Sequence, residues 1–281
     1  MPVSPVFTPL RLPAHNPSPM TGAGNNTYLL IGERGSSPSA GLIDAGVGDP
    51  RHLADLAAEL DGRHARLDAV VVTHGHPDHA AGAPAIATAH PHASFTKHPW
   101  PEEDARYAVA WHRIGDGDVI TAGDVPLVAL HTPGHSPDHM AFWHEPSRTI
   151  FTGDLVVQGS SVMIHWSRGG DLGHYLSSLE RLLALEPRRL LPAHGPAIDD
   201  PRAVLLGYLA HRRERERQVV QALRTGHSSV QAIAESIYDG LAPALMPAAQ
   251  ENVRAHLEKL KADGLAAHED DQWTLFGSSF E

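Results

Sequence analysis

The sequence predicts a mixed α/β or α+β fold, and two observations lead to it. Strand-like apolar runs alternate along the chain with segments whose apolar residues recur at helical spacing, as in 50–60. Short turns also join neighbouring strand-like runs, as in 118–130, which is the pattern of antiparallel hairpins. Because hairpins and strand–helix alternation occur together, the pattern excludes a purely doubly wound sheet.

The order of the elements follows from the same periodicities. Strands are expected at 26–31, 40–44, 69–72, 93–97, in a hairpin over 118–130, and at 140–143, 149–151 and 273–276. Helices are expected at 50–60, 80–89, 171–185, 201–224, 228–238 and 248–263.

The length and composition bound the class of protein. A chain of 281 residues favours one large and one small domain, which we expect at 1–200 and 201–281. The absence of cysteine excludes disulfides, thiolate zinc sites and cysteine nucleophiles. No apolar run approaches the roughly 18 residues that a membrane span needs, and residues 1–20 lack the features of a signal peptide. The expected location is therefore the cytoplasm, with no membrane partner.

The net charge of −11 lies mainly in the larger domain. Of the 22 Lys and Arg and the 33 Asp and Glu, residues 201–281 hold 9 and 11, so residues 1–200 carry a net charge of −9. Nonspecific affinity for nucleic acid comes mostly from Lys and Arg. The charge distribution therefore disfavours nucleic acid as a partner.

The loop 73–79 follows an apolar strand and crowds three histidines and an aspartate together: His74, His76, Asp78 and His79. Neutral imidazole nitrogens and carboxylate oxygens are ligands for Zn²⁺ and related metals. In an extended loop His74 and His76 point the same way and can reach one metal, whereas Asp78 and His79 diverge and suit a second. The alternative, a solvated surface turn rich in histidine, is disfavoured.

Three later residues, His135, Asp154 and His194, each follow the end of an apolar run. Loops at one edge of a sheet can bring together ligands that are far apart in sequence. Each residue alone is a weak signal, because the chain contains 21 histidines. Their occurrence in order, after the histidine-rich loop, is a much stronger indication of a metal site.

The full ordered pattern resembles the metallo-β-lactamase superfamily. The matching residues are His74-x-His76-x-Asp78-His79, His135, Asp154 and His194, with Asp44 at the position of an early supporting aspartate. The resemblance implies a four-layer αββα sandwich with the ligands at one edge. It further implies that His74, His76 and His135 hold one metal, that Asp78, His79 and His194 hold a second, and that Asp154 bridges them. Asp44 would orient the histidine loop without touching a metal.

The tail after residue 200 resembles a winged helix, because three predicted helices precede a terminal strand pair. The charge alternation over 211–217 predicts a solvated helix face. The helix expected to read nucleic acid, 251–261, is only weakly basic, which favours a role in packing or as a pocket wall. Together with the core, this tail resembles the beta-lactamase-like protein 2 group. That resemblance implies either a single-strand endoribonuclease or a thioesterase.

Our functional hypothesis is a dinuclear zinc hydrolase that uses a metal-bridging hydroxide on an ester-like bond, in particular a thioester. The ligand set is also compatible with Fe or Mn. Asp78 is the candidate to orient the water and take its proton. The substrate would be a small molecule or an acyl thioester. The competing hypotheses are a single-strand endoribonuclease and a metal-stabilised, winged-helix nucleic-acid-binding protein.

The segment 159–170 follows Asp154 and is expected to pass over the metals. His165 and Trp166 are therefore candidates for a substrate wall, although core packing explains their apolar neighbours equally well. His139 lies four residues after His135, but Ser136-Pro137 breaks any helix between them. We expect His139 to be a structural residue or to support the ligands from behind them, not to bind a metal itself. Substrate identity and oligomeric state are left open by the sequence.

Overall fold

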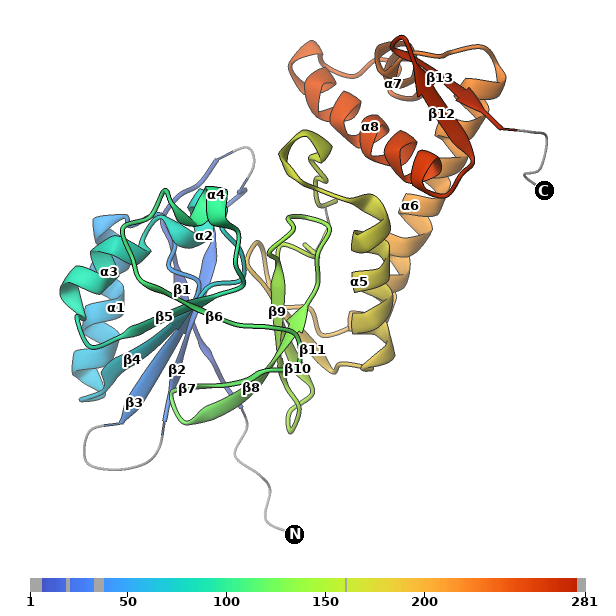
Figure 1. The fold of residues 1–281 in the computed structure, drawn as a ribbon. Coiled ribbons are helices and arrows are strands. Elements are labelled where there is room, and N and C mark those ends of the chain that lie inside the picture. The colour runs from blue at the N-terminus through green and yellow to red at the C-terminus, as the bar shows by residue number, and fades with distance from the viewer. Residues whose placement is uncertain (1–6, 19–20, 33–37, 160, 277–281) are drawn as a thin grey trace.

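The computed structural model describes residues 7–18, 21–32, 38–159 and 161–276 and shows a two-sheet sandwich followed by a small helical domain (Figure 1). The first sheet has the order β1-β2-β3-β4-β5-β6. Its strands are β1 (Leu10–Pro13), β2 (Asn26–Ile31), β3 (Ser39–Ile43), β4 (Arg66–Val71), β5 (Ser94–Lys97) and β6 (Trp111–Arg113). The first three strands run antiparallel, and β3 to β6 run parallel. The mixed fold predicted from the sequence is confirmed.

The second sheet has the order β11-β10-β9-β8-β7. Its strands are β7 (Val119–Ala122), β8 (Val125–His131), β9 (Met140–His144), β10 (Thr149–Gly153) and β11 (Arg189–Pro192). The two expected hairpins, β7–β8 and β9–β10, both form, and β11 joins β10 in parallel. Because β8, β10 and β11 all point the same way, their ends meet at one edge of the sheet.

The two sheets pack face to face through a shared apolar core. Tyr28 and Val71 of the first sheet meet Phe142 and Phe151 of the second, and all four are buried. The approach is close at Gly41, where an added Cβ would lie 2.4 Å from the Cβ of Ala122. Any larger side chain at this position would therefore push the sheets apart.

Helices cover the outer face of each sheet, so the expected four-layer arrangement is confirmed (Figure 1). The helices of the sandwich are α1 (Pro50–Gly62), α2 (Pro77–Ala80), α3 (Ala83–Ala89), α4 (Pro101–Asp104) and α5 (Leu172–Ala184), with a 3-10 turn η1 (Trp166–Arg168). Leu56 of α1 and Ile86 of α3 pack on the first sheet. Leu179 of α5 packs on the second. Each fully buried leucine of this kind contributes about 1.5–3 kcal/mol.

The helix predicted over 80–89 is confirmed from Ala83 to Ala89, as α3, but it does not extend back to Ala80. The chain forms two short helices, α2 and α3, separated by Ala81 and Gly82. Gly82 packs so tightly that an added Cβ would lie 2.1 Å from the carbonyl oxygen of Ala45, and its N–H donates to the carbonyl of Gly46. The tertiary contact therefore replaces the continuous helix that the apolar spacing suggested.

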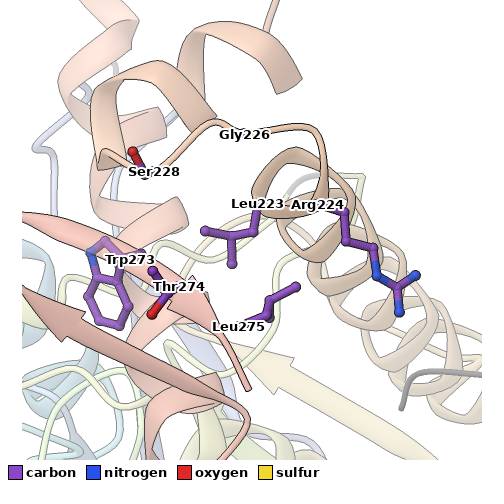
Figure 2. A pocket seen from close by; sticks show the side chains of 7 residues that line it. All are labelled: Leu223, Arg224, Gly226, Ser228, Trp273, Thr274 and Leu275. Atoms are coloured by element: carbon purple, nitrogen blue, oxygen red, sulfur yellow. The ribbon is translucent and has the colours of Figure 1, made fainter. Parts of the chain in front are cut away.

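The C-terminal domain contains α7 (Val230–Ile237), a 3-10 turn η2 (Pro243–Leu245), α8 (Met246–Ala262) and the antiparallel hairpin of β12 (Ala266–Glu269) and β13 (Gln272–Leu275). Its core includes Val219, Ile233, Leu257 and Trp273. This order of helices and hairpin matches the predicted tail. A cavity of about 510 Å³ lies between this hairpin and the end of the helix that precedes α7 in the chain. Leu223 and Leu275 are among the residues that line it (Figure 2).

The helix α6 (Pro201–Arg224) joins the two domains. Its first half contributes Leu205 and Leu209 to the outer core of the sandwich, and its second half contributes Val219 to the core of the small domain. The solvated face predicted over 211–217 is wrong at Arg212, which is only 2% exposed. Among the described residues, no helix is long and apolar enough to cross a membrane.

Candidate metal centre

The histidines and aspartates singled out in the sequence meet at one edge of the sandwich. The loop 73–79 follows β4, and His135, Asp154 and His194 follow β8, β10 and β11. Because the last three strands are parallel to one another, their ends lie on the same side. The sheet topology therefore brings together residues that are up to 120 positions apart in the sequence.

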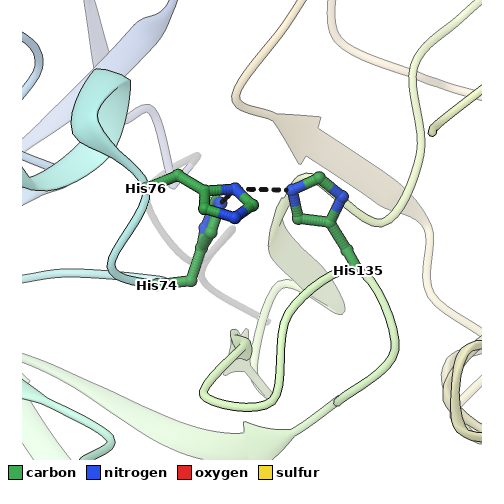
Figure 3. Close-up of side chains that lie close together, drawn as sticks. All are labelled: His74, His76 and His135. Carbon is green, nitrogen blue, oxygen red and sulfur yellow. Dashed lines mark hydrogen bonds between the residues drawn. The ribbon is translucent and has the colours of Figure 1, made fainter. Parts of the chain in front are cut away.

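One group consists of His74, His76 and His135, whose rings lie close together and nearly perpendicular to one another (Figure 3). Nδ1 of His76 lies 3.0 Å from Nε2 of His74 and 3.0 Å from Nε2 of His135. The other ring nitrogen of His135 contacts the carbonyl oxygen of Met163 at 3.1 Å, which fixes the orientation of that ring. Three nitrogens thus converge on one point.

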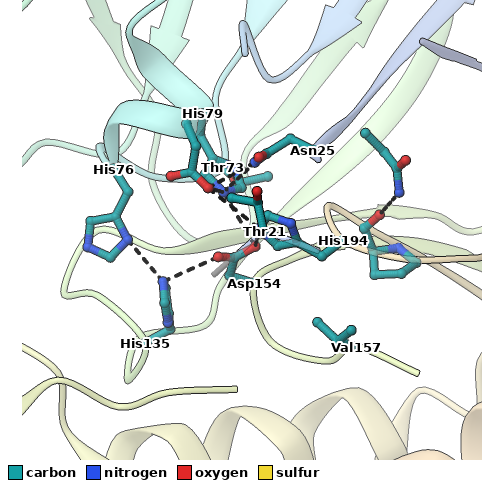
Figure 4. Close-up of polar contacts among 12 residues, drawn as sticks. Thr21, Asn25, Thr73, His76, His79, His135, Asp154, Val157 and His194 are labelled. Atoms are coloured by element: carbon teal, nitrogen blue, oxygen red, sulfur yellow. Dashed lines mark hydrogen bonds and ion pairs between the residues drawn. The ribbon is translucent and has the colours of Figure 1, made fainter. Parts of the chain in front are cut away.

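A second group consists of Asp78, His79, Asp154 and His194 (Figure 4). Oδ1 of Asp154 lies 3.4 Å from Nε2 of His79 and 3.2 Å from Nε2 of His194. The other carboxylate oxygen, Oδ2, lies 3.5 Å from Nε2 of His135 in the first group. Asp154 therefore contacts both groups, one oxygen toward each.

Two histidines of the first group, His74 and His76, are neutral at ordinary pH. Burial, reinforced by the neighbouring His135, lowers the pKa of His76 to about 3. Burial and the nearby His79 hold the pKa of His74 well below its usual range. Nδ1 of His76 lies within reach of two ring nitrogens but can form a hydrogen bond with only one, because a neutral ring nitrogen carries either one lone pair or one N–H. A cation at the point of convergence would satisfy all three nitrogens.

The second group separates charge instead. Burial acts to raise the pKa of Asp154, but His79 and His194 hold it well below its ordinary value. Burial acts to lower the pKa of His194, but the Asp154 carboxylate raises it to about 9. The buried carboxylates therefore stabilise positive charge in this group, including the protons on His79 and His194. A divalent cation can supply that charge in place of the two protons. The two groups together form a dinuclear His/Asp metal-binding site.

Asp44 contacts the histidine loop from behind the site. Its Oδ2 lies 2.8 Å from Nδ1 of His79, and its Oδ1 accepts from the backbone N–H of Thr73 at 2.8 Å. The first contact assigns the proton of His79 to Nδ1 and leaves Nε2 directed at the site. Asp44 itself takes a positive φ of 63°, a backbone conformation that these contacts hold in place.

His139 lies next to the site and contacts it through the backbone of Asp154. Its Nε2 accepts the backbone N–H of Asp154 at 3.1 Å, and its Nδ1 lies 2.9 Å from the hydroxyl of Thr132. Burial, with the neighbouring His135, holds the pKa of His139 well below its usual range, so the ring is neutral. The expected structural role is confirmed, and its specific task is to position Asp154.

Several residues at the site gave no recognisable signal in the sequence. Asn25, immediately before β2, donates to Oδ2 of Asp78 at 3.1 Å. Lys97 and Asp138 form a buried ion pair at 2.7 Å, and Asp138 also accepts the backbone N–H of Gly75. Trp100 lies 6.1 Å from His76, ring to ring. Single polar residues next to strands are common, so no spacing distinguished these from surface residues.

The two residues considered for a substrate wall occupy the segment between the domains. Trp166 is 38% exposed, and the guanidinium of Arg254 lies 4.3 Å from its ring centroid. The backbone N–H of Ser167 donates to Glu251 at 3.2 Å. His165 is half-buried, and burial lowers its pKa. The segment thus packs against α8, and its contact with substrate stays a prediction.

Comparison with known proteins places this geometry among metal-dependent hydrolases. Residues 20–194 match the family described as the Metallo-beta-lactamase superfamily, and residues 229–273 match the beta-lactamase associated winged helix domain. The chain aligns over 98% of its length with a crystal structure of a beta-lactamase domain protein from Burkholderia ambifaria. That alignment covers 93% of the other chain, with a TM-score of 0.80 and 23% identity, which shows the shared fold.

Two curated relatives are more similar in sequence. A beta-lactamase-like protein 2 homolog from Drosophila melanogaster is 32% identical over 268 residues, which cover 91% of this chain and 88% of that protein. An atrochrysone carboxyl ACP thioesterase from Aspergillus chevalieri is 34% identical over 240 residues, which cover 82% of this chain and 72% of that protein. Both similarities extend across most of the sandwich and into the tail.

Proposed function

The chain belongs to the metallo-beta-lactamase superfamily and has its dinuclear His/Asp metal site, and from this we propose that it is a zinc hydrolase that cleaves thioesters. The observation that best supports hydrolase activity is the position of Asp154, whose carboxylate contacts both groups of metal ligands. The thioester preference is supported by the similarity to a relative named as a thioesterase. The net charge of −9 on residues 1–200 further supports a substrate other than nucleic acid.

The residues of the site would hold two divalent ions, one at the three histidines and one at the group with Asp78. Nitrogen and oxygen ligands of this kind suit Zn²⁺. When bound, two such ions make water acidic enough to act as a nucleophile near neutral pH, and they polarise the bond under attack. Asn25 holds Asp78 in place, and we assign to Asp78 the orientation of the attacking water. Burial acts to raise the pKa of Asp78, but His79 lowers it, so this carboxylate is a better orienting group than proton acceptor.

The test is a panel of substrates assayed with and without a chelator. The panel contains acyl thioesters, lactones, phosphodiesters, β-lactams and single-stranded RNA. We expect thioester cleavage that the chelator abolishes, and a loss of more than about 100-fold in His135→Ala, since a metal ligand matters more than its outer partners. His112→Ala serves as the matched control, because His112 is exposed on β6.

The same panel tests the endoribonuclease hypothesis, and a separate binding titration with duplex DNA tests the nucleic-acid-binding hypothesis. Cleavage of single-stranded RNA, with steeply salt-dependent binding, would favour the endoribonuclease and overturn the thioesterase. Duplex binding that survives chelation would favour the nucleic-acid-binding protein. Against that last function stands the packing of α8, where Glu251 and Arg254 contact the segment around Trp166 instead of pointing freely into solvent. If no substrate is cleaved faster than by His135→Ala, the proposed hydrolase is wrong.

A further inference from the structure

A second cavity, of about 300 Å³, lies between the sandwich and the C-terminal domain. Val162 and Met163 of the segment after Asp154 form one side, and α6, Tyr238 and the start of α8 form the other. The same segment contacts the metal centre, since the carbonyl oxygen of Met163 lies 3.1 Å from Nδ1 of His135. Met163 therefore borders this cavity and also contacts the ligand His135.

Two arginines of α6, Arg212 and Arg215, line the cavity. They are three positions apart and so share one face of the helix. In the part of the chain that the structure describes, neither guanidinium has a carboxylate within ion-pair distance. The neighbouring Arg213 and Arg217, on the opposite face, pair with Glu180 and Glu214 at the surface. The helix thus has one face with paired arginines and one with unpaired arginines.

Arg212 is 2% exposed, donates hydrogen bonds only to neutral acceptors and lies 5.3 Å from the ring centroid of Tyr175, while Arg215 lies 4.2 Å from that of Tyr238. One terminal nitrogen of Arg212 donates to Oδ1 of Asn252 at 2.8 Å, and the other to the carbonyl of Val162. Its Nε is buried without a hydrogen-bond partner, and so is Nε of Arg215. Burying a guanidinium without a counter-charge is costly, so this arrangement indicates that an anion completes it.

The start of α8 adds further positive potential. Ala248 and Ala249, in its first turn, line the cavity. No side chain caps this end of the helix; the N–H of Met246 donates to the carbonyl of Pro243 and Pro247 has none, so Ala248 and Ala249 supply the backbone N–H groups nearest the cavity. A helix N-terminus of this length attracts anions through those groups and through its dipole. Asn252 is held by Tyr238, to whose hydroxyl it donates at 2.6 Å, which keeps the polar wall in place.

We propose that this cavity binds a carboxylate or phosphate group carried by the substrate whose bond is cleaved at the metal centre. This inference rests on the proposed function for the link to catalysis, but not for the binding of the anion. Leu241 and Leu245 line the same cavity, so the arm that carries the anion has an apolar portion. Arg212 and Arg215 bind the anionic group and thereby select substrates.

The first experiment measures binding alone, on chelator-treated full-length protein. Inorganic phosphate and succinate are titrated by calorimetry against the wild type, Arg212→Met, Arg215→Met and the control Arg213→Met. We expect saturable binding of at least one anion to the wild type and to Arg213→Met. Loss of one charge-assisted contact should weaken it about tenfold in each of the other two variants. If Arg212→Met does not fold, Arg215→Met decides the outcome.

Two results of that titration would overturn the proposal. One is that the wild type binds neither phosphate nor succinate. The other is that Arg212→Met and Arg215→Met bind as tightly as Arg213→Met, which would locate any bound anion elsewhere. Neither result depends on a thioester being cleaved, so the proposed function can fail while the anion site stands.

The second experiment asks whether the anion belongs to the substrate. Glutaryl thioesters are compared with their methyl esters, and thiols bearing a phosphate with the same thiols lacking it. A substrate-borne anion predicts that kcat/KM favours one charged member by about tenfold or more, and that the preference disappears in Arg215→Met but persists in Arg213→Met. Equal kcat/KM for charged and neutral members would refute selection of substrates by this cavity, and the site would then be one for a free anion.

Discussion

The buried pair of Lys97 and Asp138 offers a sharp test of how the histidine loop is held. Nζ of Lys97 lies 2.7 Å from Asp138, 2.7 Å from Asp104 and 2.6 Å from the carbonyl of His98. Both side chains of the Lys97–Asp138 pair are fully buried. Asp138 in turn accepts the N–H of Gly75, between two histidines of the metal site, at 2.7 Å.

The perturbation is Lys97→Met, which removes the charge and keeps most of the apolar volume. Asp138 would retain only the N–H of Gly75 and the hydroxyl of Ser136 as donors. Removing one partner of a buried ion pair costs about 3–5 kcal/mol, so we expect the free energy of unfolding to fall by that amount. The double variant Lys97→Met/Asp138→Asn should recover about 1–3 kcal/mol, because it removes the unpaired carboxylate.

The assay is urea denaturation of the metal-free protein, followed by a zinc competition titration of each variant. We expect Lys97→Met to lose about 10- to 100-fold in metal affinity, because the loop that carries the ligands is held through Gly75. A loss of stability below about 1 kcal/mol would refute the idea that the pair is buried and essential. Strict additivity in the double variant would equally contradict the direct coupling of the two charges.

Three further outcomes are expected. Burial lowers the pKa of His256 to about 4 from its ordinary value of 6.5, so the unfolded chain binds the proton first as the pH falls. The stability that this residue contributes is therefore full above about pH 6.5 and declines toward pH 4. Denaturation at both pH values should show that the free energy of unfolding of His256→Leu, measured relative to wild type, is about 2 kcal/mol higher at pH 5 than at pH 7.5. Asn25→Ala should weaken metal binding about 10-fold without unfolding the protein, as competition titration would measure, and unchanged affinity would argue against its contact with Asp78. Zinc at 1,000 times the wild-type dissociation constant should raise the free energy of unfolding of the wild type by about 4 kcal/mol. An equal rise for His135→Ala at the same zinc concentration would contradict the ligand assignment.

The sequence predicted the fold where local pattern and tertiary structure agree. The strand at 26–31 and the helix at 201–224 match β2 and α6 at both ends, since apolar periodicity and flanking turn residues coincide there. The pattern at 80–89 predicted α3 but missed the break before it, because the contact of Gly82 with Ala45 joins segments far apart in the sequence. The strands β1 and β6 are short and lack a clear alternation, so no local signal marked them.

The same distinction separates the site residues that were anticipated from those that were not. Four of the seven histidines and aspartates are crowded into the loop 73–79, the other three follow it in order after apolar runs, and the structure brings all of them together. Asn25, Lys97 and Arg212 act through contacts that only the folded chain creates. For Arg212, alternation of charge along the helix suggested solvent, whereas the docking of the C-terminal domain buries that face.

The continuity of α6 determines how related proteins can be recombined. The hydroxyl of Tyr208 donates to the carbonyl of Val157 at 2.9 Å and accepts its N–H at 2.8 Å, so this helix holds the chain just beyond Asp154. A chimera joined at residue 200 would replace Leu205, Tyr208 and Leu209 together with the tail and so disturb the ligand edge. A chimera joined after residue 210 keeps those contacts native and exchanges the face with Arg212 and Arg215, together with all that follows it.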